Sequence, residues 1–149
     1  MYHIEYQTIP ITEENINLLE QLRYNAYGID STNFKVEETY HAKQLREGKY
    51  LVFGCFLETQ LAGACYISNS YNSLYIEQLF IKKEYQRSNL HLGSNLLKYI
   101  LKNKQIIENY FQTNFYYSYL DTSKNNEQLF LQLGYQEKNF LMYKNLGHK

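Results

Sequence analysis

A run of polar residues that leads into a glycine is the part of this sequence best suited to chemistry. It extends from Glu84 to Ser94 and enters an amphipathic segment, Gly93 to about Phe111. The first N–H groups of a helix have no partner inside the helix and, with the helix dipole, they attract anions. Gly93 would let the backbone approach an anion closely, and Ser94 and Arg87 add a hydroxyl and a cation. The pattern indicates a phosphate site; an ordinary polar connection capped by Gly93 is the alternative.

A second candidate is Glu77, a carboxylate within the apolar segment Leu74–Ile81. Apolar neighbours raise the pKa of a carboxylate, and a raised pKa suits a general base. Alternation along a strand puts Glu77 on one face with Leu79 and Ile81. The opposite face then holds Ile76, Gln78 and Phe80. The alternative is a carboxylate that is solvated or paired with a Lys or Arg.

The elements that must position these residues follow from hydrophobic periodicity and turn residues. The predicted strands are His3–Ile9, Tyr50–Leu57, Leu61–Ser68, Leu74–Ile81, Asn114–Leu120 and Phe140–Tyr143. The predicted helices are a first one from the cap Thr12 to Ala26, then Val36–Arg46, Gly93–Phe111 and Asn126–Leu133.

The resulting order is β-α-α-β-β-β-α-β-α-β, an α/β (α+β) arrangement with helices beside a mixed, mostly antiparallel sheet. Only the unit Leu74–Leu120 contains a long crossover helix, so its two strands are expected to be parallel.

Composition restricts the class of protein. The 149 residues fit a single domain, residues 1–149, and the formal net charge is zero. Nucleic-acid and membrane-surface proteins need a basic excess, so neither partner is expected. The N-terminus shows no secretion signal, and Cys55 and Cys65 are expected to be reduced, buried thiols, which favours a cytoplasmic location.

At this point the sequence resembles the GNAT N-acetyltransferase superfamily. Gln86-Arg87-Ser88 followed by Leu92-Gly93-Ser94 is similar to the two ends of the family signature Gln/Arg-x-x-Gly-x-Gly/Ala, which holds the pyrophosphate of acetyl-CoA. Two residues are inserted and the first glycine is missing, with Asn89 or His91 near its place. Leu61–Ala64, Leu74–Ile81 and Leu133–Tyr135 extend the resemblance over nearly the whole chain.

The resemblance implies which residues bind the coenzyme. The backbone of Leu79, Phe80 and Ile81 would face the pantetheine and the thioester carbonyl. Asn126 would bind the pantetheine amides or simply cap a helix, and Phe130 stands near the position of the family's proton-donating Tyr. The remaining implied contacts are Gln86, Arg87, Ser88, Asn89, His91, Leu92, Gly93 and Ser94.

The resemblance also implies the reaction, a direct transfer of acetyl from acetyl-CoA to a primary amine of a small molecule or protein. Glu77 would be the base, and no metal is needed. Because Phe130 has no proton to give, Tyr117 is the candidate acid that protonates the departing thiolate. Tyr116 and Tyr119 are alternatives, and so is departure of the thiolate with help from water or a backbone dipole. His41 could border the acceptor groove.

Acceptor specificity is expected from the first two helices and the loop between them. The candidate residues are Tyr27, Asp30, Phe34 and Tyr40, although Asp30 could equally be a solvated or capping charge. A homodimer is compatible with the family. Two rival hypotheses are a weak or inactive GNAT-fold protein that binds or senses acyl-CoA, and an interaction protein that binds no nucleotide.

Overall fold

The computed structural model describes residues 2–121, 127–138 and 141–146, in which a seven-stranded sheet has the order β1-β2-β3-β4-β5-β7-β6. All neighbouring strands are antiparallel except β4 and β5, which are parallel as predicted. The mixed, mostly antiparallel sheet expected from the sequence is therefore confirmed. The strands are β1 Ile4–Thr8, β2 Leu51–Leu57, β3 Gln60–Ser70, β4 Ser73–Ile81, β5 Tyr117–Asp121, β6 Gln136–Lys138 and β7 Leu141–Asn145.

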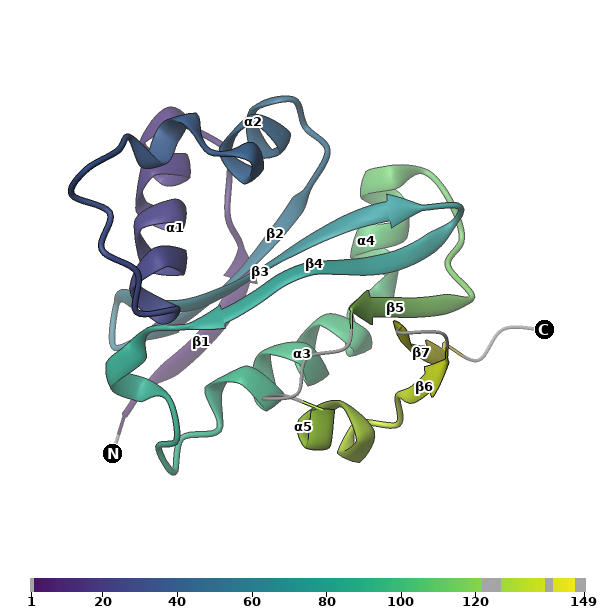
Figure 1. Ribbon diagram of the computed structural model, residues 1–149. Coiled ribbons are helices and arrows are strands. Elements are labelled where there is room, and N and C mark those ends of the chain that lie inside the picture. Colours follow the sequence, from purple (N-terminus) through teal and green to yellow (C-terminus); the bar gives the residue numbers. More distant parts are fainter. Residues whose placement is uncertain (1, 122–126, 139–140, 147–149) are drawn as a thin grey trace.

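Helices cover both faces of the sheet. Figure 1 shows α1 and α2 on one face and α3 and α5 on the other. Each face has its own apolar core, one centred on Leu19, Leu45 and Phe80, the other on Leu96, Ile100 and Phe53. No helix within the described residues is long and apolar enough to cross a membrane. The helices are α1 Glu13–Ala26, α2 Tyr40–Arg46, α3 Leu92–Lys102, α4 Lys104–Phe111 and α5 Glu127–Gln132, with 3-10 turns at Val36–Glu38 and Lys83–Tyr85.

The start of α1 follows the sequence prediction. The Thr12 side chain accepts a hydrogen bond from the Asn15 N–H at 3.1 Å, which satisfies one of the free amides of the first turn. Glu13 and Glu14 lie in that turn, where their negative charges interact favourably with the positive end of the helix dipole.

Two predicted helices are divided in the structure. The segment predicted as one helix to Phe111 ends as α3 at Lys102, because the Asn103 side chain bonds to the Tyr99 carbonyl and α4 begins at Lys104. The helix predicted over Val36–Arg46 is a 3-10 turn followed by α2. Thr39 separates them, since its side chain caps α2 by accepting from the Ala42 N–H.

The predicted alternation of side chains along β4 is wrong in part, because the strand contains a β-bulge. Tyr66 pairs with Gln78 but Ile67 pairs with Ile76, so Glu77 has no partner in the register with β3. Such an extra residue reverses the alternation beyond it. Ile76 therefore packs in the core beneath α3, whereas Phe80, predicted to share its face, packs in the core beneath α1.

The strands β4 and β5 separate after a short contact. β4 pairs with β3 along its length, but only Leu74, Tyr75 and Ile76 pair with β5. From Glu77 to Ile81, the β4 edge that faces β5 has no strand beside it among the described residues. The end of β4 can therefore offer main-chain groups to another molecule.

Candidate functional site

A cavity of about 550 Å³ lies where the end of β4, the end of α1 and the start of α3 meet. Its size is within the range of small-molecule sites. It brings together ten of the thirteen residues that the sequence suggested as coenzyme contacts. The lining residues are Ala26, Tyr27, Leu79, Phe80, Ile81, Tyr85, Gln86, Arg87, Ser88, His91, Leu92, Gly93 and Ser94.

The N-terminus of α3 supplies free amides to this cavity. The first intrahelical bond runs from the Asn95 N–H to the His91 carbonyl at 3.0 Å, and no side chain caps the helix. Among the described residues, the N–H groups of Leu92, Gly93 and Ser94 therefore have no acceptor. A Cβ on Gly93 would lie 3.6 Å from Ile81 Cγ1, so the missing side chain opens the approach without relieving a clash.

The loop before α3 turns without a glycine. Arg87 and His91 adopt left-handed backbone conformations with φ of 60° and 51°. Such values are uncommon outside glycine, although His is among the residues that tolerate them better. Asn89, the other residue suggested near the missing glycine, is exposed and is not part of the cavity lining.

Gln86 and Ser88 use their side chains to shape the loop. Gln86 Nε2 donates to the carbonyl oxygens of Ala26 and Ile81, both at 2.7 Å, and so joins the ends of α1 and β4. Ser88 Oγ donates to the Tyr85 carbonyl at 2.8 Å. By contrast, Arg87 is exposed and forms no ion pair with a described residue, so its charge is available to an anion in the cavity.

Glu77 is not part of the cavity lining, although it stands two residues before Leu79, which is. The Ser68 hydroxyl donates to Glu77 Oε2 at 2.6 Å, and both side chains are half-buried. Burial, together with the charge of Glu77, raises the pKa of Tyr50, which places this carboxylate on the α1–α2 side of the sheet.

The structure does not bring Tyr117 or Phe130 to the cavity. Ser118 pairs with Leu74, so Tyr117 lies beside the first residue of β4, six residues and roughly 20 Å of strand before Leu79. Phe130 is buried in the core beneath α3 and packs edge-to-face on Tyr135 at 5.9 Å. Asn126 lies outside the described residues.

Of the four residues suggested to contact the acceptor, one lines the cavity and three do not. Tyr27 lines the cavity, and its hydroxyl donates to Gln78 Oε1 at 2.8 Å. Tyr40 is exposed and makes an edge-to-face contact with His41, with the ring centroids 5.3 Å apart. Asp30 accepts from the Thr32 N–H at 3.0 Å, so it closes its own turn. Phe34 packs on Tyr24 and is not part of the cavity lining.

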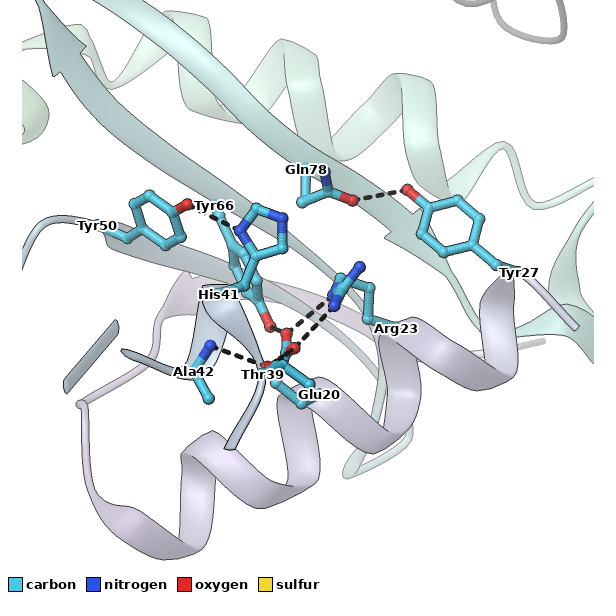
Figure 2. A network of polar contacts seen from close by, with 9 residues as sticks. All are labelled: Glu20, Arg23, Tyr27, Thr39, His41, Ala42, Tyr50, Tyr66 and Gln78. Carbon is cyan, nitrogen blue, oxygen red and sulfur yellow. Dashed lines mark hydrogen bonds and ion pairs between the residues drawn. The ribbon is translucent and has the colours of Figure 1, made fainter. Parts of the chain in front are cut away.

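Sequence reasoning missed a buried polar network between α1 and β3. Figure 2 shows the fully buried Glu20 at its centre, where it accepts hydrogen bonds from Arg23, Thr39 and Tyr66. The signal available in the sequence was a Glu and an Arg three residues apart on a helix, among the apolar positions that must face the core.

Comparison with family models identifies one family. Residues 19–145 match the family model described as an acetyltransferase (GNAT) domain. None of the curated proteins matches the chain.

Solved structures share the fold at low sequence identity. The PaiA N-acetyltransferase of Thermoplasma acidophilum, solved in complex with coenzyme A, is 18% identical with a TM-score of 0.69, over 96% of this chain and 99% of that one. The ribosomal-protein-S18-alanine N-acetyltransferase of Escherichia coli is 14% identical with a TM-score of 0.70, over 100% and 96% of the two chains. At these identities the likeness establishes the fold.

Proposed function

Since this chain belongs to the GNAT acetyltransferase family, we propose that it transfers the acetyl group of acetyl-CoA directly to a primary amine of a small molecule or protein. The observation that carries the proposal is the cavity at the start of α3. Three amides that have no acceptor among the described residues, those of Leu92, Gly93 and Ser94, lie there with the cation of Arg87.

The diphosphate of the coenzyme fits the donor set at this end of the cavity. The amides of Leu92, Gly93 and Ser94 and the positive end of the α3 dipole favour an anion. The exposed Arg87 adds a cation, and the first turn of α3 contains no acidic residue whose charge would repel an anion. The PaiA N-acetyltransferase, which shares this fold, was solved in complex with coenzyme A, and this supports a coenzyme site in the present chain.

The pantetheine arm and the thioester would lie along the free edge of β4. Leu79, Phe80 and Ile81 line the cavity, and this part of the strand has no neighbour on its β5 side among the described residues. A main-chain N–H at this edge would stabilise the negative charge that develops on the carbonyl oxygen during attack. Bound acetyl-CoA supplies the activated acyl group.

Glu77 is the proposed base. An alkyl amine has a pKa near 10.4, so it must lose a proton before it can attack the thioester. The bond from Ser68 orients the carboxylate, and the second oxygen, Oε1, is left to accept that proton directly or through a water molecule. A thiol with a pKa of about 8.5 can leave as the anion and take its proton from solvent.

Two measurements test the proposal. Calorimetry should show binding of acetyl-CoA, and a panel of primary amines should produce amine-dependent release of the free coenzyme thiol. Absence of coenzyme binding contradicts the proposal, whereas binding without thiol release for any amine favours a protein that senses acyl-CoA.

A further inference from the structure

The guanidinium of Arg23 on α1 is mostly buried and is held by Glu20 on the same helix. Its Nε and Nη2 donate to the two oxygens of Glu20 at 2.9 and 2.8 Å, and only 11% of its side chain is exposed. Glu20 also accepts from Thr39 Oγ1 at 2.5 Å and from the Tyr66 hydroxyl at 2.7 Å. Because four donors share this carboxylate, part of its negative charge is taken up by groups other than Arg23.

The third nitrogen of Arg23, Nη1, has no hydrogen-bond partner among the described residues. Every buried side-chain nitrogen or oxygen in that part of the chain has a partner, so Nη1 must be reached by solvent. Figure 2 shows it directed away from Glu20, toward the side where Gln78 and Tyr27 lie. The positive charge of Arg23 also acts on Tyr27 and on His41, since it works to lower the pKa of each.

The neighbours of Arg23 add further N–H donors. Gln78 Oε1 accepts from the Tyr27 hydroxyl at 2.8 Å, whereas Gln78 Nε2 bonds to no described residue and so must be reached by solvent. His41 Nδ1 lies 2.7 Å from the Tyr50 hydroxyl. Burial and the charge of Arg23 hold the pKa of His41 below its ordinary value, so the ring is neutral near pH 7. When Tyr50 donates to Nδ1, the ring proton lies on Nε2.

We propose that the polar site made by Arg23, Gln78 and His41 (Figure 2) binds a carboxylate of the amine acceptor, so that the acceptor is an amino acid or a similar molecule with a free acid group. The inference rests on the proposed function, since it describes the acceptor of that reaction. The remaining Nη1 group of Arg23 and two neutral donors match a carboxylate.

The position of Glu77 supports the same orientation. Glu77 and Gln78 are consecutive residues at the β-bulge, and their side chains contact Ser68 and Tyr27, both associated with the α1–α2 face. An acceptor with its acid group at Gln78 and Arg23 would present its amine toward Glu77. Donors at one end and a carboxylate at the other are complementary to a zwitterion.

The test measures binding of acetylated products without turnover. Calorimetry compares N-acetylalanine, N-acetylleucine, N-acetylglutamine and N-acetylphenylalanine with their carboxamides, in the free protein and with coenzyme A present. We expect at least one acid to bind about tenfold or more tightly than its amide, the difference typical of a charged hydrogen bond.

The variant Arg23→Lys should remove that preference, because one ammonium cannot serve both Glu20 and the ligand. Arg46→Lys is the matched control, since Arg46 pairs with Glu13 on the surface of α2 and should leave the preference intact. Should Arg23→Lys fail to fold, Gln78→Leu provides a second variant and should weaken the preference.

Equal affinity for acid and amide, or no binding of any acid, overturns the inference. So does an unchanged preference in a folded Arg23→Lys protein. Failure of coenzyme A to bind, with the acid preference retained in the free protein, contradicts the proposed function alone.

Discussion

The hydroxyl of Tyr66 on β3 donates to Oε2 of Glu20 on α1 at 2.7 Å, in a site from which both side chains exclude solvent. This bond joins the first helix to the centre of the sheet. It also holds the carboxylate that orients Arg23, so the packing of α1 and the orientation of that guanidinium depend on the same contact.

Replacing Tyr66 by Phe should lower the free energy of unfolding by roughly 1.5–3 kcal/mol, the usual contribution of a hydrogen bond to a charged group. The buried carboxylate then loses one of its donors while the ring packing is kept. Urea denaturation measures the change. Tyr71→Phe is the control, because Tyr71 is fully exposed and should alter stability by less than about 0.5 kcal/mol. A loss no larger than that in Tyr66→Phe would contradict the prediction.

Glu20 should titrate below its ordinary pKa of 4.5. Burial opposes its ionisation, but the hydrogen bonds from Arg23, Thr39 and Tyr66 outweigh that cost and lower the pKa. The stabilisation is therefore fully present above pH 4.5 and is lost as the pH falls through the folded-state value. A carbon-13 NMR titration of the Glu20 carboxyl measures this directly. A midpoint at or above 4.5 would show that burial dominates.

The variant Gly93→Asp should abolish measurable binding of acetyl-CoA by calorimetry while the protein remains folded. Its carboxylate would stand among the free amides of α3 and repel the diphosphate. Gly93→Ala is the control: its Cβ would make an ordinary 3.6 Å contact with Ile81 Cγ1, so affinity should change by only a few-fold. Unchanged affinity in the Asp variant would remove the phosphate site from α3.

For Glu77→Gln we expect kcat to fall about 100-fold or more, with little change in the KM for acetyl-CoA. Gln keeps an oxygen for the Ser68 hydroxyl but cannot accept a proton from the amine. Steady-state kinetics across pH should show that the wild-type rise of kcat with pH is flattened. Glu47→Gln, on the exposed surface, should behave as wild type. A wild-type profile in Glu77→Gln would exclude this residue as the base.

Both cysteines should be unreactive in the folded protein. Burial raises the pKa of Cys55 to about 11, and that of Cys65 still further. Little thiolate then exists at pH 8, and access is blocked. A disulfide reagent such as DTNB should label neither thiol within minutes at pH 8 and both after unfolding in urea. Rapid labelling of the native protein would contradict the burial described for them.

Some features of the site were predictable because they depend on neighbouring residues along the chain. Thr12 caps α1 through an amide three residues away, and the start of α3 exposes its amides whatever packs beside it. The parallel pairing of β4 and β5 follows from the helical crossover between them. Such local rules led from the sequence to the cavity at Gly93.

Other features arise from contacts that no local rule contains. The bulge at Glu77 reverses the faces of β4 only because β3 pairs on both sides of it, and Phe130 enters the core because α5 packs beneath the sheet. Arg23 became a candidate for binding the acceptor only in the folded chain. There Thr39 and Tyr66, which are distant from Glu20 in the sequence, donate to the same carboxylate as Arg23. The sequence by itself determined most of the elements and the free amides at the start of α3, since those depend on short-range hydrogen bonding. The tertiary structure decided the polar network around Arg23, since burial and charge pairing depend on which distant residues pack together.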